Sequence, residues 1–286
     1  MKRTLTDTLV LLLCLGALFA QGAKEPTDGK TIKELSVYYV PSREPAEIIT
    51  VTEPLKELLI AELANNGYVV ENVKITVGTT YEAVGVALSA GTADIGLIPA
   101  NTFLLYEDGC EVILTATRDG LSVDSDDPRD WNNNEPITAA ATQAIGYRAL
   151  MIAGPSAKGK ELSAKVQANK KLTWEDINSA NWSVMSSTSP AGYVYPTIFL
   201  MEHYDGKTIG DLAHTVQSDS YGSAFARLAV GQVDVLVTYA DARRDQESKW
   251  MDTYGRKNTI WEETDVIGVT PMIYNDTVSV SRTSEK

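Results

Sequence analysis

Apolar and polar positions follow the same pattern in two distant segments of the chain. A Tyr, a Leu, a Gly and an Asp recur at one spacing, at Tyr81, Leu88, Gly91 and Asp94 and again at Tyr221, Leu228, Gly231 and Asp234. Each segment predicts a helix of about ten residues, ended by a glycine suited to a helix C-terminus and followed by a buried strand. The repeat therefore predicts two similar α/β lobes.

The remaining apolar runs extend this pattern to most of the chain. Strands are predicted at residues 35–40, 73–77, 111–117, 147–155 and 182–185, and helices at 53–63, 161–168 and 197–203. Strands that alternate with helices predict parallel sheets, whose ligands bind at the carboxyl ends of the strands. A cleft between two such lobes is a common site for small ligands. Residues 124–136 predict a solvated loop, because the Gly and Glu of an EF-hand calcium loop are missing.

The N-terminus has the pattern of a secretory signal peptide. Lys2 and Arg3 precede an apolar run at residues 9–20, which is too short to span a bilayer, and Gly22 offers a cleavage point. Residues 1–22 are therefore predicted to direct export to the periplasm or to the outer face of the cytoplasmic membrane. Cys14 lies inside the apolar run without a small residue before it, which disfavours a lipid anchor.

Charge and cysteine content narrow the function further. The formal net charge is −13 for the whole chain and becomes −14 once residues 1–22 are removed. A strongly acidic protein is a poor partner for nucleic acid or for anionic membrane surfaces. Cys110 is the one cysteine outside the signal peptide, so no intrachain disulfide is expected.

The repeat also separates binding candidates from structural residues. Tyr81 and Tyr221 begin their helices and so lie on the rim where the strands end. Asp94 and Asp234 follow the helices, about 15 Å away at 1.5 Å per residue. We therefore expect the two Asp residues to serve as turn and cap residues.

A run of hydroxyl side chains separates a predicted strand from a predicted helix. Ser187, Thr188 and Ser189 can cap that helix, or they can line an anion site together with the free N–H groups of its first turn. Both interpretations remain open from the residues alone. Hydroxyls, backbone N–H groups and tyrosines would provide enough donors for an anion without any arginine.

The sequence gives little support for catalysis. His203 and His214 do not have the spacing of metal ligands, and neither a nucleophile elbow nor a phosphate- or dinucleotide-binding loop is present. We therefore predict that the protein is not an enzyme and uses no cofactor or metal. A phosphoester hydrolase remains an alternative.

Six segments in order resemble a known family. They lie at residues 37–42, 78–84, 91–99, 187–193, 231–234 and 270–276. Together they are similar to the phosphate-, phosphite- and phosphonate-binding subunits of ABC importers. The resemblance implies a type II periplasmic-binding-protein fold, α/β in class, with two lobes and a ligand cleft between them.

The resemblance also implies which residues meet the ligand. Tyr81 and Tyr147 match tyrosines that contact the ligand, Tyr221 matches a polar residue that opens a late helix, and the oxygen-binding run corresponds to residues 187–189. Asp241 and Asp276 match acids that can face a ligand's amino group, which predicts a preference for an aminoalkylphosphonate over phosphate. Asp241 could instead pair with Arg243 or Arg244, and Asp276 could be a turn residue.

The expected organisation follows from the same comparison. The first lobe is expected at residues 31–117 and 243–286, the second at 145–238, and the crossover segments at 118–144 and 239–242. Relatives usually continue with further C-terminal helices, so one face of the first lobe is expected to be less covered. The implied function is the extracytoplasmic substrate-binding component of an importer for phosphonate-type oxyanions, with a permease and an ATPase as partners. A sensor ectodomain on the same fold is the alternative.

Overall fold

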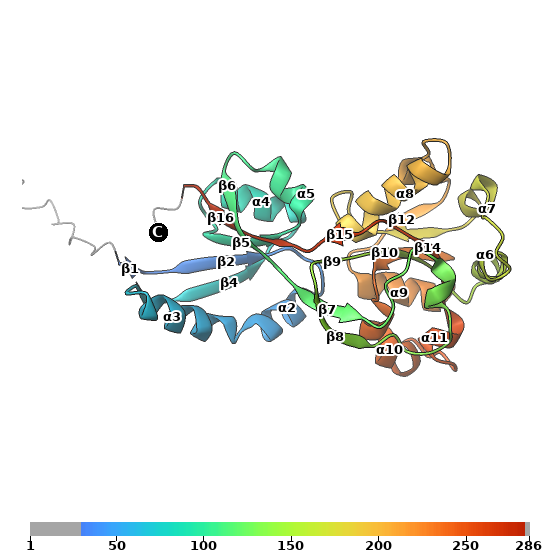
Figure 1. Cartoon of the computed structure of the whole chain (residues 1–286), viewed down its shortest axis with the longest axis horizontal. Coiled ribbons are helices and arrows are strands. Elements are labelled where there is room, and N and C mark those ends of the chain that lie inside the picture. Colours follow the sequence, from blue (N-terminus) through green and yellow to red (C-terminus); the bar gives the residue numbers. More distant parts are fainter. Residues whose placement is uncertain (1–29, 284–286) are drawn as a thin grey trace, which may run out of the picture.

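The computed structural model of the protein describes residues 30–283. The predicted signal peptide at residues 1–22, including Cys14, lies outside the described residues. Within the described range, no helix is long and apolar enough to cross a membrane. The chain forms two α/β lobes side by side, joined by strands that cross between them (Figure 1). The two-lobed α/β architecture is therefore confirmed.

The first lobe is built on a five-stranded sheet in the order β4-β2-β5-β16-β6. These strands are β2 (Leu35–Tyr39), β4 (Val73–Val77), β5 (Ile95–Ile98), β6 (Cys110–Thr115) and β16 (Thr277–Ser281). β2 pairs in parallel with β4 and β5, whereas β16 runs antiparallel to both of its neighbours. A separate two-stranded sheet joins β1 (Thr31–Ile32) to β3 (Val69–Val70).

Four helices accompany this sheet. They are α2 (Pro45–Thr52), α3 (Leu55–Asn65), α4 (Tyr81–Ser89) and α5 (Ala100–Leu105). The helix predicted at residues 53–63 corresponds to α3, but α2 was not predicted. The β-branched residues of α2, such as Ile48 and Val51, lower its helix propensity and obscure it in the sequence. α3 has no fully buried residue, so its apolar face is only partly covered.

The second lobe contains a five-stranded sheet in the order β12-β11-β13-β10-β14. The strands are β10 (Ala149–Ala153), β11 (Trp182–Val184), β12 (Thr215–Gln217), β13 (Val235–Tyr239) and β14 (Asp265–Val269). Its helices are α6 (Ala157–Gln167), α7 (Trp174–Asn178), α8 (Tyr195–His203), α9 (Tyr221–Ala229), α10 (Arg243–Asp252) and α11 (Ile260–Glu263). Every residue of β10 is buried, because helices cover both faces of the sheet.

Residues 243–269 belong to the second lobe, so their expected assignment to the first lobe is wrong. β14 pairs with β10, and Trp250 and Ile260 are fully buried in one core with Phe225. Figure 1 shows α10 and α11 beside α9, in the second lobe. Only the last strand, β16, returns to the first sheet. The apolar pattern of 243–269 marks these residues as core without showing which core they join.

Two segments cross between the lobes. The first contains β7 (Arg118–Leu121) paired with β8 (Ala139–Ala144), and then β9 (Gly146–Tyr147). The second contains β15 (Ile273–Tyr274), which pairs with β9 (Figure 1). The expected crossover at residues 239–242 is wrong, because this stretch connects β13 to α10 within the second lobe.

The sequence repeat is present in the structure. α4 and α9 have nine residues each, and the side chains of Thr80 and Ser220 cap their N-termini. Gly91 and Gly231 follow them with φ values of 71° and 72°, which favour glycine because a side chain would be strained there. The same helix–turn–strand unit therefore places a tyrosine on the rim of each lobe.

Candidate ligand-binding site

A small cavity lies where the two lobes and the crossover segments meet. Its volume is about 130 Å³, and we call it the inner chamber. Its lining residues come from both lobes and are Ser42, Arg43, Tyr81, Pro99, Arg118, Tyr147, Ser189, Pro190, Ala191, Tyr221, Tyr239 and Asp276. Of the predicted ligand residues, the chamber brings together Tyr81, Tyr147, Ser189, Tyr221 and Asp276.

The repeat helices bring two tyrosines into the chamber. Tyr81 and Tyr221 are the first residues of α4 and α9, and both are buried. Burial raises the pKa of Tyr221 to about 12 and that of Tyr81 well above its usual value. Both phenols therefore stay protonated at neutral pH and can donate hydrogen bonds to an anion. Tyr221 also packs edge-on against Tyr239, with ring centroids 4.9 Å apart.

Ser189 occupies the chamber from the second lobe. Its hydroxyl lies 3.2 Å from the Tyr221 hydroxyl and accepts a hydrogen bond from the N–H of Gly192. This bond begins the π-helical turn Pro190–Val194, which continues into α8. A side chain at Gly192 would meet Met185 at 2.3 Å, so the tight turn needs glycine. The hydroxyl run thus contributes one buried serine and the start of a helical turn.

The other two hydroxyl residues of the run do not line the chamber. Ser187 is exposed, and Thr188 lies at the contact between the lobes. The Thr188 carbonyl oxygen accepts a hydrogen bond of 2.9 Å from Asn101 of α5, and its hydroxyl interacts with the Glu82 carboxylate of α4. Thr188 therefore connects the two lobes across the edge of the site.

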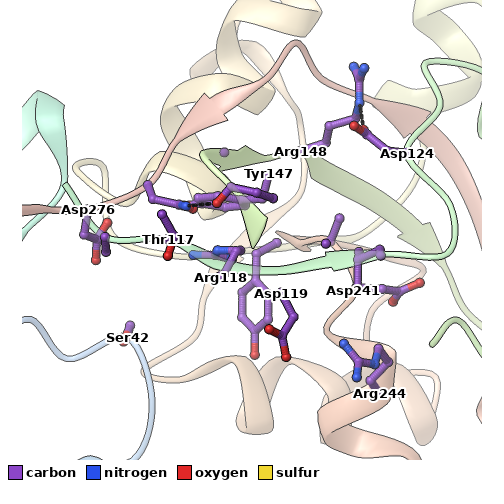
Figure 2. Close-up of a pocket in the computed structure, with 18 of the residues that line it drawn as sticks. Ser42, Thr117, Arg118, Asp119, Asp124, Tyr147, Arg148, Asp241, Arg244 and Asp276 are labelled. Atoms are coloured by element: carbon purple, nitrogen blue, oxygen red, sulfur yellow. Dashed lines mark hydrogen bonds and ion pairs between the residues drawn. The ribbon is translucent and has the colours of Figure 1, made fainter. Parts of the chain in front are cut away.

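Arg118 lines the chamber, although hydroxyls, backbone N–H groups and tyrosines were expected to supply enough donors for an anion without an arginine. Its guanidinium lies 4.0 Å from the centre of the Tyr147 ring. Figure 2 labels both side chains. Its buried Nε atom has no hydrogen-bond partner among the described residues. Arg118 begins β7, directly after the first lobe. Its position as a cation at the start of a crossover strand is the sequence feature that could have identified it as a site residue. An unsatisfied buried donor of this kind is available to a ligand.

Among the described residues, Asp276 is the one carboxyl group that lines the inner chamber. It precedes β16, and its backbone oxygen accepts a hydrogen bond from Ala116 at the end of the first lobe. Burial raises the pKa of Asp276, while nearby Arg118 acts in the opposite direction. The structure gives its side chain no hydrogen bond within the described chain. An acid in this position can face a ligand directly.

Asp241 is held by Arg243 instead of facing the chamber. The two side chains are almost completely buried and form an ion pair of 2.7 Å. The carboxylate also accepts hydrogen bonds from the backbone N–H and the Nε of Arg243. Pairing with Arg243 was the alternative left open by the sequence. Its carboxylate is therefore already satisfied within the protein.

A larger cavity adjoins the inner chamber, and we call it the outer chamber. Its volume is about 560 Å³, and it lies between β7, β8 and the start of α10 (Figure 2). The two chambers share Ser42, Arg43, Arg118, Tyr147, Tyr239 and Asp276. Within the described residues, no cluster of three His, Cys, Asp or Glu side chains could hold a metal ion. The site as a whole presents donors for a small anion and an adjoining space for more of a ligand.

Comparison with known proteins assigns the chain to a family model. Residues 37–286 match the model described as the periplasmic substrate-binding protein of a phosphonate ABC transporter. No curated protein sequence matches the chain.

Solved structures share the fold at low sequence identity. A binding protein component of a Pseudomonas aeruginosa ABC phosphonate transporter has a TM-score of 0.60 and 16% identity, covering 88% of this chain and 70% of its own. PhnD1 of Prochlorococcus marinus in complex with methylphosphonate has a TM-score of 0.53 and 13% identity, covering 88% and 78%. A putative thiamine pyrophosphate transporter protein of Mycoplasma hyorhinis has a TM-score of 0.57 and 14% identity, covering 88% and 84%.

Proposed function

The chain belongs to the family of phosphonate-binding periplasmic proteins of ABC transporters, and on that premise we propose that its inner chamber binds the phosphonate group of the ligand. The observation that carries the proposal is the convergence of buried donors from both lobes. The hydroxyls of Tyr81, Ser189 and Tyr221 face one chamber together with the guanidinium of Arg118. These groups suit the oxygens of a tetrahedral anion.

The donors are strong enough to overcome the negative charge of the protein. Hydrogen bonds to charged groups contribute about 1.5–3 kcal/mol each, so four donors can support micromolar binding, which corresponds to about 8 kcal/mol. Repulsion from acidic residues that lie more than about 8 Å from the chamber is largely screened at physiological salt. Arg118 adds a positive charge inside the chamber, where screening is weak. Local chemistry therefore favours an anion.

We further propose that ligand binding draws the lobes together. Arg43 of the first lobe pairs with Asp245 of the second at 2.8 Å, and Asn101 reaches Thr188 across the cleft. Asp245 also accepts a hydrogen bond of 2.6 Å from Tyr239, which lines the inner chamber. Asp245 therefore links a contact between the lobes, with Arg43, to a residue that lines the inner chamber, Tyr239. A permease and an ATPase are the partners proposed to receive the loaded protein.

Calorimetry with methylphosphonate tests the binding proposal. We expect one molecule to bind per chain, and Arg118→Gln to weaken binding by about tenfold to a hundredfold, as expected for one lost bond to a charged group. Arg227→Gln is the matched control, because Arg227 lies in the last turn of α9 and lines neither chamber. Equal affinities for the two variants would contradict the role of Arg118, and no binding to the wild type would contradict the proposed function.

We propose that the ligand is released chemically unchanged. The Ser189 hydroxyl is near Tyr221 and Gly192. His203 lines neither chamber and interacts through Nδ1 with the carbonyl oxygen of Phe199 on α8, so it is not placed to act as a base for that serine. Phosphorus NMR of methylphosphonate and of a phosphomonoester, incubated with the protein, should show both compounds intact. Turnover of the ester would support the hydrolase alternative.

A further inference from the structure

The outer chamber adjoins the inner chamber, with which it shares lining residues, and is much larger. The inner chamber, of about 130 Å³, is the smaller of the two and is where the phosphonate group is proposed to bind. The outer chamber adds about 560 Å³ beyond the shared residues Arg118, Tyr147 and Asp276. A ligand anchored in the inner chamber can therefore extend past Arg118 toward β7 and α10.

Most charged groups of the outer chamber already have partners. Arg148 pairs with Asp124 and Asp126, Asp241 pairs with Arg243, and Arg43 pairs with Asp245. Asp119 accepts a hydrogen bond of 3.0 Å from the side-chain amide of Gln143. These pairs leave the wall of the outer chamber largely neutral. The paired residues therefore define the shape of the chamber and contribute little net charge.

Arg244, like Arg118, has no such partner among the described residues. It lies in the first turn of α10, lines the outer chamber, and has no side-chain hydrogen bond or ion pair within the described chain. Figure 2 shows it on the far side of the chamber from Asp276. A guanidinium offers a planar pair of donors that matches a carboxylate.

We propose that the outer chamber is a second anion subsite, which binds the carboxylate end of an organophosphonate tail through Arg244. The proposal rests on the proposed function, because the phosphonate end must first be held in the inner chamber. A ligand with anionic groups at both ends would place one at Arg118 and the other at Arg244. Asp119 makes an ammonium-bearing tail the competing class.

Affinities for three phosphonates test this subsite. Calorimetry would compare methylphosphonate, 3-phosphonopropionate and 2-aminoethylphosphonate on the same purified protein. We expect 3-phosphonopropionate to bind at least tenfold more tightly than methylphosphonate. Arg244→Gln should remove most of that ratio, whereas Arg227→Gln should preserve it. Because Arg244 is exposed, thermal unfolding should confirm that the variant folds like the wild type.

The remaining outcomes separate this inference from the proposed function. If methylphosphonate binds and 3-phosphonopropionate binds no more tightly, the carboxylate subsite is wrong while the phosphonate site stands. If 2-aminoethylphosphonate binds most tightly, the tail is cationic and the subsite assigned to Arg244 is also wrong. If none of the three binds, the proposed function fails and this inference fails with it.

Discussion

At the scale of single residues, the site combines groups with opposite preferences for charge. Arg118 attracts an anion, while Asp276 in the same chamber would repel one when it is ionised. Asp276 is also the acid that could favour an ammonium group, since Asp241 is already paired with Arg243. The protonation state of Asp276 therefore bears on both stability and ligand choice.

Replacing Asp276 with Asn should stabilise the unliganded protein at neutral pH. Burial raises the pKa of Asp276, so the folded protein binds the proton more tightly than the unfolded chain, and stability falls as pH rises through that range. Asn removes this penalty. The gain in melting temperature over the wild type should be present at pH 7 and should vanish below the ordinary aspartate pKa of about 3.9.

Asp252→Asn is the control for this comparison, because Asp252 lies at the exposed end of α10. Thermal unfolding would be measured for both variants across the pH series. A gain for Asp276→Asn that is equal at all pH values would mean that the titration of this carboxyl group does not cause it.

At the scale of elements, the repeated unit ends in a buried aspartate that organises the next strand. Asp234 accepts hydrogen bonds from the backbone N–H of Asn181 at 2.8 Å and from the Ser156 hydroxyl at 2.6 Å. Asp94 accepts from the N–H and hydroxyl of Ser36 in the first lobe. Both residues connect a turn to a neighbouring element, which confirms the structural role predicted for them.

Asp234→Ala should destabilise the fold without removing the ligand site. Loss of the carboxylate leaves buried donors unsatisfied, and we expect a decrease of about 1–3 kcal/mol in the free energy of unfolding. Denaturant unfolding measures this change. Methylphosphonate should still bind one per chain, because α9 separates Asp234 from the inner chamber. Exposed Asp219 provides the control Asp219→Ala, and an equal loss of stability in both variants would contradict the assigned role.

At the scale of the whole molecule, the described contacts hold the two lobes against each other. The crossing segments restrain their separation, while Arg43 and Asn101 reach residues of the second lobe directly. The ion pair of Arg43 is partly exposed, and such pairs contribute about 0.2–1 kcal/mol. Closure therefore depends on several weak contacts that a bridging ligand can reinforce.

Asn101→Ala should shift the protein toward an open form. Loss of one hydrogen bond, worth about 0.5–1.5 kcal/mol, should weaken methylphosphonate binding by roughly twofold to tenfold although Asn101 does not line the inner chamber. Small-angle scattering should show compaction of the wild type on adding methylphosphonate, and the same final radius for the variant at saturation. Asn65→Ala, on the exposed surface of α3, should behave like the wild type. An unchanged radius of the wild type on binding would contradict closure.

The sequence by itself determined the repeating unit and the residues at its rim. Periodicity, capping residues and glycines are local features, so they predicted α4 and α9, their strands, and the positions of Tyr81 and Tyr221. The same local logic identified Asp94 and Asp234 as structural. The residue types alone could predict hydrogen-bond donors for an anion. The hydroxyl run also placed Ser189 correctly beside a helical turn.

Only the tertiary structure decided how distant segments share cores and sites. Residues 243–269 joined the second lobe because Trp250 and Ile260 complete its core, and an apolar pattern does not specify its partner. The structure adds Arg118 to the residues that line the chamber, because Arg118 packs on Tyr147. It removes Asp241 from the acids that can meet a ligand, because Asp241 pairs with Arg243. Both contacts depend on tertiary packing. Burial and pairing of charges are properties of the folded chain, so the sequence could name the charged residues but not which of them remain available to a ligand.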